Sequence, residues 1–211
     1  MYFKNRKLSR SCILHVTLII LTIIILSYEN TTHANNLVMQ KNIEKYFATI
    51  NNIKNIESNF IQINTNSSIQ KGNIKISRPG FMRLNYSKPS NITIICDGKW
   101  MIVRNILMDE TSYLPLNKTP IYILISHPLI INKNIYLKNI KERSGLITIQ
   151  ITLNNIRNIM LTLIFTKNPF KLKQWTNHNI QNNCTNIILE NLNIKKLPFK
   201  IKLFQYHQNL S

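Results

Sequence analysis

The chain has 211 residues, 44% of them hydrophobic, and a formal net charge of +19 at pH 7. This length allows one domain with a sizeable core and argues against several domains. A basic charge fits a nucleic-acid or anionic-membrane partner, but the 38 Ile and 31 Asn residues favour a second interpretation, an AT-rich coding bias. After the N-terminal leader the charges form no dense basic run, so the sequence does not favour nucleic-acid binding.

The first 34 residues have the three zones of a secretory signal peptide. A basic leader precedes the apolar residues 12–27, and Thr32-His33-Ala34 places small residues where cleavage requires them. We expect residues 1–34 to be removed and residues 35–211 to form one domain outside the cytoplasm. Removing the leader's four basic residues and its one Glu lowers the net charge from +19 to +16. The alternative is a retained anchor, although this apolar run is shorter than the about 20 residues that span a membrane.

Residues 35–56 have the spacing of an amphipathic helix. Asn35 or Asn36 can cap its start, and apolar side chains recur three and four positions apart. These side chains are Met39, Ile43, Tyr46, Phe47, Ile50 and Ile53. We expect this helix to cover one face of a sheet.

From residue 58 the apolar period changes to two, which is typical of β-strands. Turn-forming segments rich in Asn, Ser, Pro, Gly and Asp separate the expected strands. The expected strands are residues 58–64, 69–77, 82–86, 91–97, 99–105, 110–116, 135–143, 146–153, 159–166, 171–177 and 185–194. The tight turns predict a mainly β fold, an antiparallel meander of about eleven strands with two helices.

Between the sixth and seventh strands, residues 117–128 predict a short apolar helix. Thr119 can cap it, Pro120 suits its first position, and Pro128 ends the segment. Two interpretations stay open, a sheet over a solid core or a curved sheet whose apolar cavity this helix covers. Periodicity alone favours the solid core, whereas an empty apolar cavity needs such a lid because exposed apolar surface aggregates.

An arginine lies at the end of an apolar strand face. Ile74 and Ile76 share a face whose parity runs on to Arg78, immediately before a Pro-Gly corner. The apolar face of the next strand comprises Met82, Leu84 and Tyr86. A guanidinium in this position needs hydrogen-bond partners. The alternative is an arginine that reaches solvent with its methylenes lying on apolar neighbours.

The sequence indicates no catalytic or metal site. Cys96 and Cys184 follow the leader, and the sequence does not decide between a disulfide and free thiols. There is no C-x-x-C pair and no Cys/His cluster at metal-ligand spacing. The histidines His127, His178 and His207 are isolated, and the acidic residues form no acid–base pair. We therefore expect no enzyme activity, no metal and no cofactor.

Seven segments in chain order resemble the LolA-type periplasmic carriers of outer-membrane lipoproteins. They are NFIQI (59–63), GNIKISRPGFMRLNY (72–86), CDGKWMIV (96–103), LPLNKTPIYILI (114–125), LTLIFTKNPFKLKQW (161–175), TNIILENL (185–192) and LPFKIKLF (197–204). The resemblance implies an incomplete antiparallel β-barrel of about eleven strands, with helices lining its opening. It also implies a monomeric periplasmic carrier that shields the acyl chains of triacylated lipoproteins. An inner-membrane ABC transporter would release this cargo to the carrier, and an outer-membrane acceptor would receive it.

The resemblance also implies roles for individual residues. Arg78 matches the arginine that hydrogen-bonds to the backbone of the lid helices and acts as a latch on the empty carrier. The positions that match an acyl-chain-binding lining are Ile74, Ile76, Met82, Leu84, Tyr86, Trp100, Ile121 and Leu124. One departure is Arg104, which stands where the family often has tyrosine. Two alternatives remain, a periplasmic lipid- or peptide-sensing module of the same fold and a basic envelope protein that binds anionic lipid headgroups.

Overall fold

The computed structural model describes residues 43–131, 135–153, 160–178 and 184–206. The chain divides into two compact units, Met1–Tyr46 and Phe47–Ser211. Residues 43–46 of the first unit are helical, and so are residues 47–52 at the start of the second. The expected leader, its cleavage site and the helix start at residues 35–42 lie outside the described residues. Within the described ranges, no helix has the length and apolarity needed to span a membrane.

The predicted N-terminal helix extends too far in the sequence. The helical residues end at Asn52, where the Ile53 N–H bonds back to the Ile50 carbonyl across 3.1 Å. Asn55 and Ile56 belong instead to the first strand. Sheet pairing decides this boundary, because Ile56 lies opposite Ile76 in the antiparallel ladder.

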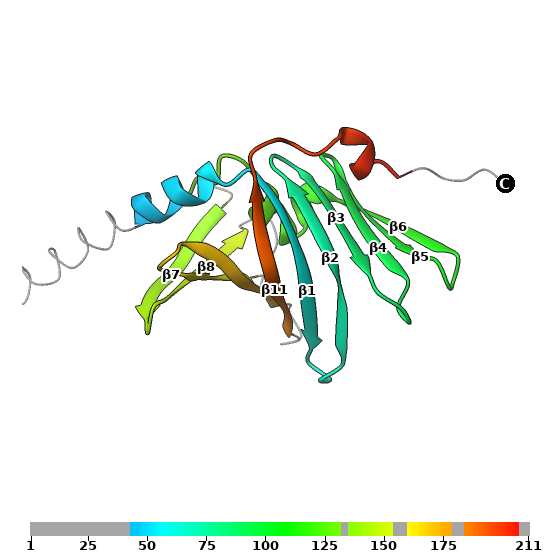
Figure 1. Cartoon of the computed structure of the whole chain (residues 1–211), viewed down its shortest axis with the longest axis horizontal. Helices are drawn as coiled ribbons and strands as arrows, with labels where there is room; N and C mark the ends of the chain where they lie inside the picture. Colours follow the sequence, from blue (N-terminus) through cyan, green and yellow to red (C-terminus); the bar gives the residue numbers. More distant parts are fainter. Residues whose placement is uncertain (1–42, 132–134, 154–159, 179–183, 207–211) are drawn as a thin grey trace, which may run out of the picture. The chain divides into compact units, whose positions relative to one another are not determined.

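Eleven antiparallel strands form one sheet, as the alternating pattern predicts (Figure 1). They are β1 (Asn55–Asn64), β2 (Ile69–Ser77), β3 (Phe81–Tyr86), β4 (Ile92–Asp97), β5 (Trp100–Asn105), β6 (Glu110–Pro115), β7 (Ile135–Arg143), β8 (Leu146–Leu153), β9 (Met160–Thr166), β10 (Lys171–His178) and β11 (Cys184–Lys195). The spatial order is β6-β5-β4-β3-β2-β1-β11-β10-β9-β8-β7. The sheet is therefore two meanders joined by the pairing of β1 with β11, and β6 and β7 are its edge strands.

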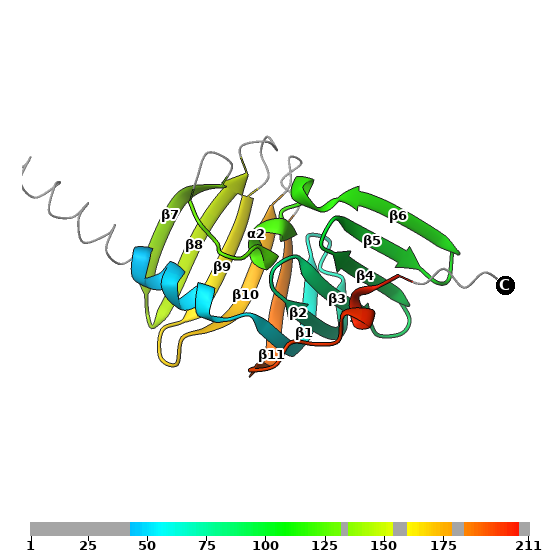
Figure 2. The ribbon, with the colours of Figure 1, turned by 90° about the horizontal axis from the view of Figure 1, so that it is seen from above.

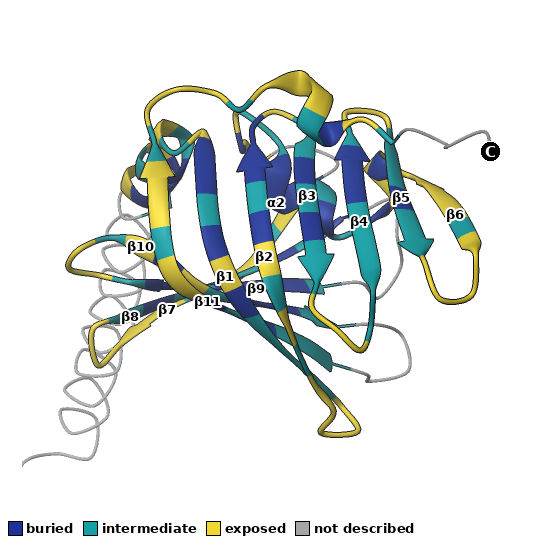
Figure 3. Ribbon diagram, turned by 45° about the vertical axis from the view of Figure 1, so that its right-hand side comes forward, coloured by how far each residue is buried: buried dark blue, intermediate teal, exposed yellow. Residues whose placement is uncertain are grey.

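The two faces of the sheet differ in polarity. Along β8, Ile147, Ile149, Ile151 and Leu153 are buried while the residues between them are only half-buried. The same alternation colours β2 and β3 in Figure 3. We call the face that carries Ile149 and Leu84 the inner face, and the opposite one the outer face.

A short helix lies against the inner face. The 3-10 helix η1 (Leu116–Lys118) leads into α2 (Ile121–Ile125), whose Ile123 and Ile125 are almost fully buried. Figure 2 shows α2 near the middle of the strand order. The predicted cap is wrong, because the Thr119 hydroxyl donates back to the Leu116 carbonyl at 2.7 Å instead of accepting a bond from α2. Pro120 occupies the N-cap position, and α2 is correspondingly short.

The C-terminal segment covers part of the outer face. The 3-10 helix η2 (Ile201–Phe204) contacts β3 and β4. The rings of Phe204 and Phe81 lie 5.7 Å apart, and Arg83 donates to the Leu203 carbonyl at 3.1 Å. Arg83 and Arg78 therefore serve opposite faces of the sheet.

Candidate functional site

The inner face contains a cavity of about 240 Å³ beneath the start of α2. Its apolar lining comes from β3, β4, β5, β10, β11 and α2. The side chains of this lining are Met82, Leu84, Ile94, Met101, Ile121, Trp175 and Ile187. The inner face combines the two alternatives, a solid core and a cavity. Tightly packed strands lie on either side of a central space.

Four of the expected lining residues, Met82, Leu84, Tyr86 and Ile121, border this cavity. Ile74 and Ile76 lie on the same face, opposite Leu84 and Met82 in the ladder, but they are packed within the core. Leu124 borders a second, smaller cavity described below.

Trp100 lies away from the cavity. Its neighbour Met101 lines the cavity, and successive side chains of a strand point to opposite faces. Trp100 therefore belongs to the outer face, where the Lys99 ammonium lies 5.8 Å from its ring centre. Met101 and Trp175 replace it in the lining. The alternation along residues 100–105 could have shown that Met101, and not Trp100, faces the cavity, once the pairing of β4 with β5 was known.

One end of the cavity is polar. Tyr86 donates to Gln62 Oε1 at 2.6 Å, and Gln62 Nε2 donates to Gln70 Oε1 at 3.2 Å. Burial raises the pKa of the Tyr86 hydroxyl to about 12, so it remains a donor at neutral pH. Asn177 and Thr185, which pair across β10 and β11, complete this end.

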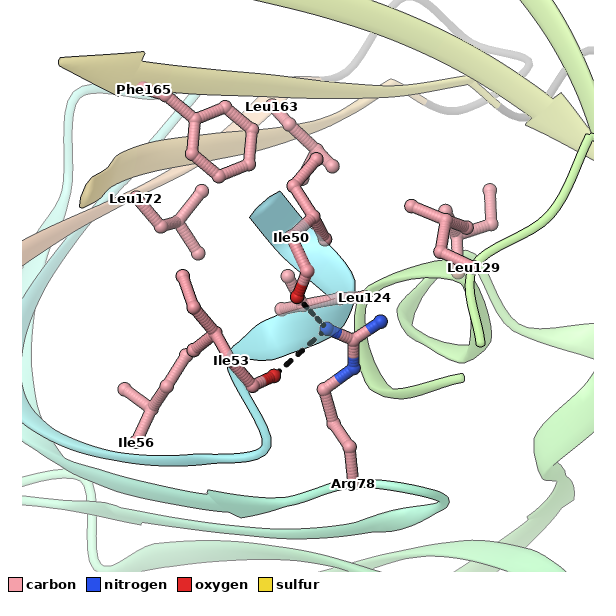
Figure 4. A pocket seen from close by; sticks show the side chains of 10 residues that line it. Ile50, Ile53, Ile56, Arg78, Leu124, Leu129, Leu163, Phe165 and Leu172 are labelled. Atoms are coloured by element: carbon pink, nitrogen blue, oxygen red, sulfur yellow. Dashed lines mark hydrogen bonds between the residues drawn. The ribbon is translucent and has the colours of Figure 1, made fainter. Parts of the chain in front are cut away.

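Arg78 lies beside the second cavity, which measures only about 20 Å³ (Figure 4). Its Nη1 donates to the carbonyls of Ile50 at 2.8 Å and Ile53 at 3.0 Å, and its Nε donates to the Ser126 carbonyl at 2.7 Å. The Arg78 side chain thus binds carbonyls at the ends of two helical segments. Ile50 and Ile53 lie at the end of the helical residues 47–52, and Ser126 ends α2. The main chain adds a bond from Gly80 N–H to the Ile125 carbonyl at 2.8 Å.

The guanidinium of Arg78 is buried and incompletely bonded. The residue is 7% exposed, and its Nη2 has no hydrogen-bond partner among the described residues. Burial lowers the pKa of Arg78 to about 10, so the group is still charged at neutral pH. A charge in apolar surroundings strengthens each bond to it and makes any broken bond costly.

The structure brings together three residues that the sequence left apart. His178 Nδ1 lies 3.2 Å from Cys184 Sγ, and its Nε2 lies 3.2 Å from the Thr162 hydroxyl. Their ladder positions place all three on the outer face, so His178 is not isolated. Cys96 and Cys184 are both thiols and form no disulfide with each other, and burial raises the pKa of Cys96 to about 12. His207 lies outside the described residues.

Three solved structures are similar to this chain at low sequence identity. A LolA superfamily protein from Nitrosomonas europaea is 8% identical, with a TM-score of 0.45, covering 77% of this chain and 97% of its own. An uncharacterized conserved protein from Thermus thermophilus is 8% identical, with a TM-score of 0.46 and coverages of 81% and 96%. The MucA/MucB complex of Pseudomonas aeruginosa gives 12% identity, a TM-score of 0.44 and coverages of 77% and 59%. No curated protein sequence matches the chain.

The family model described as outer membrane lipoprotein carrier protein LolA matches residues 51–207. The match begins at the helical residues before β1, spans the whole sheet and ends just after η2. It includes both cavities except for Ile50, together with Arg78 and α2. The chain belongs to the LolA family of outer membrane lipoprotein carrier proteins.

Proposed function

We propose that this protein is a periplasmic carrier that shields the acyl chains of triacylated lipoproteins and transfers them from the inner to the outer membrane. The observation that carries the proposal is the apolar cavity beneath α2, with Arg78 holding the elements that cover it. An inner-membrane ABC transporter would load the carrier, and an outer-membrane acceptor would unload it. The proposed acyl-chain contacts are Met82, Leu84, Tyr86, Met101, Ile121 and Leu124, and Trp100 is left out.

Both cavities are too small for cargo as they stand. A volume of about 240 Å³ lies below the roughly 300–1,000 Å³ of typical ligand pockets. The second cavity also borders α2, since Ile121 lines the first and Ile123 and Leu124 line the second. Displacing α2 would join the two spaces into one apolar channel along the inner face. Loading therefore requires α2 to move.

Arg78 gives this movement a defined cost. Burial of an acyl chain contributes about 0.8 kcal/mol per CH₂ group, or on the order of 10 kcal/mol for a long chain. Hydrogen bonds to a charged group contribute about 1.5–3 kcal/mol each. The free energy needed to break the three hydrogen bonds of Arg78 would thus offset a large part of the free energy gained by burying the acyl chain. We infer that this opposition keeps lipid binding reversible and makes hand-over feasible.

The test is a loading experiment with a matched cargo. The protein is recovered from a bacterial periplasm, stripped with detergent and offered the same lipoprotein in triacylated and unacylated form. Native mass spectrometry should detect a soluble complex with the triacylated form alone. Arg78→Leu should load as well as the wild type but release its cargo more slowly to acceptor membranes. Failure of the protein to bind the triacylated form would refute the carrier function.

Salt separates this function from binding to anionic headgroups. High salt screens charges and strengthens the burial of apolar groups. Binding through the acyl chains should therefore persist or tighten between low and high salt, whereas headgroup binding should disappear. Equal binding of an unacylated peptide would instead favour a sensing module.

A further inference from the structure

The first cavity has one polar end, and two polar atoms on β10 near that end lack partners. Trp175 and Asn177 both line the cavity, two residues apart on the same face of β10. The Trp175 Nε1–H and the Asn177 Oδ1 are buried, and neither has a hydrogen-bond partner among the described residues. One is a donor and the other an acceptor. The apolar body of the cavity, including Met82 and Leu84, lies on the opposite side of the sheet centre.

The orphaned indole is unusual for such a position. Trp175 is 1% exposed, and buried indole N–H groups normally find a partner because an unmade bond in an apolar interior is costly. Its ladder neighbours are Ile187 and Leu163, both apolar, so neither side chain can accept a bond. A phenylalanine would fill much of this space without leaving a buried N–H unpaired. A tryptophan here is therefore explained by a ligand that brings an acceptor.

The same reasoning applies to Asn177, which lies two residues further along β10. It lies opposite Thr185 on β11 and borders the same cavity as Gln62, whose amide already binds Tyr86 and Gln70. Residues two apart on a strand are separated by about 7 Å. A ligand with a carbonyl oxygen near Trp175 and an N–H or O–H toward Asn177 would satisfy both atoms. A pure hydrocarbon would satisfy neither.

We propose that Trp175 and Asn177 recognise the polar linkage at the head of an acyl chain. The Trp175 Nε1–H donates to the carbonyl oxygen of an ester or amide, and Asn177 Oδ1 accepts from the N–H of an amide. The hydrocarbon then lies along Met82, Leu84 and Ile121, so the chain enters with its head at the polar end. This proposal rests on the proposed acyl-chain carrier function. It adds that the cavity selects carbonyl-linked acyl chains over other hydrocarbons of equal length.

A competition experiment tests the donor. The stripped full chain is mixed with equal amounts of methyl palmitate and hexadecyl methyl ether, delivered from cyclodextrin. These probes have the same chain length, and only the ester has a carbonyl. Native mass spectrometry reads both complexes in one sample, so the ratio does not depend on how stable a variant is. We expect about tenfold more ester than ether complex, and about equal amounts in Trp175→Phe.

Trp100→Phe is the matched control, since it makes the same change on the outer face and should keep the tenfold preference. For the acceptor, N-methyl palmitamide competes with methyl palmitate. The wild type should prefer the amide, and Asn177→Leu should remove that preference.

The outcomes separate this proposal from the carrier function. If ether and ester bind equally to the wild type, or if Trp175→Phe keeps the ester preference, recognition by Trp175 is wrong while acyl binding stands. If no probe binds but the triacylated lipoprotein still loads, the head-group proposal is wrong and the carrier function stands; if the lipoprotein does not load either, both are wrong.

Discussion

Arg78 Nη1 donates to the Ile50 carbonyl across 2.8 Å, and this bond ties the end of β2 to the helical residues 47–52. The same side chain binds the Ser126 carbonyl, so it links both segments. The proposed latch can be tested without any lipid, because amide hydrogen exchange reports local opening.

Arg78→Leu should speed hydrogen exchange in residues 47–53 and 121–126. The variant loses three charged hydrogen bonds, each of about 1.5–3 kcal/mol. A net loss of about 3 kcal/mol makes local opening about 100-fold more frequent. Arg83→Leu is the control, since it removes an arginine bonded to the Leu203 carbonyl on the outer face. Unchanged exchange at residues 121–126 in Arg78→Leu would contradict the latch.

Low pH should lower the free energy of unfolding through protonation of His127. Burial lowers the pKa of His127, and the nearby charges of Arg78 and Lys54 lower it further. The unfolded chain, with a His pKa of about 6.5, therefore binds this proton more readily than the folded protein. The contribution to stability is complete above that value and is lost as the pH falls through the lower folded pKa.

Urea unfolding at pH 7.5 and pH 5.5 measures this effect. His127→Gln should lose less stability than the wild type between the two pH values. An identical loss in both proteins would show that other groups cause the acid sensitivity.

Gly72→Ala should destabilise the sheet. A Cβ at Gly72 would lie 2.2 Å from the Asn85 carbonyl oxygen and 2.8 Å from the Phe60 ring. That ring contacts Tyr86 edge to face at 5.1 Å, so the collision would disturb the polar end of the cavity. Overpacking of this kind costs about 1–3 kcal/mol. Thermal unfolding should show a drop of several degrees, and an unchanged midpoint would mean that β2 and β3 can separate at no cost.

The two described thiols should differ in reactivity. Cys96 is fully buried with a raised pKa, whereas Cys184 is partly exposed beside His178. Burial lowers the pKa of His178, so its imidazole is neutral at pH 7 and its Nδ1 can accept a hydrogen bond from the thiol. A colorimetric thiol reagent should lose its fast phase in Cys184→Ser and keep it in Cys96→Ser. His178→Gln should slow that phase several-fold, and an unaltered rate would assign no role to the imidazole.

The strands were predictable because their signal is local. Each expected strand has an alternating run bounded by turn residues, and the Asp97 carboxylate accepts bonds from the Lys99 and Trp100 N–H groups in the expected turn. The end of the N-terminal helix was not predictable in this way. Residues 53–56 continue the helical spacing, but their pairing with β2 depends on partners about twenty residues away.

The cavity lining was only partly predictable, since it depends on which face each strand turns inward. Met82, Leu84 and Tyr86 follow from simple alternation. Trp175 does not, because the pairing of β9 with β10 shifts register between Leu172 and Gln174. Leu172 and Trp175, three positions apart, are therefore both buried. Alternation alone places them on opposite faces.

The pairing of β1 with β11 also governs when the protein can first bind anything. Thr65 and Cys184 exchange two hydrogen bonds although 119 positions separate them in the chain. Such distant pairings form late, after the local hairpins, because loop closure must precede them. The cavity draws its walls from both meanders, so it does not exist until the last strand has been delivered and docked. An incomplete chain therefore has no cavity in which a ligand could be held.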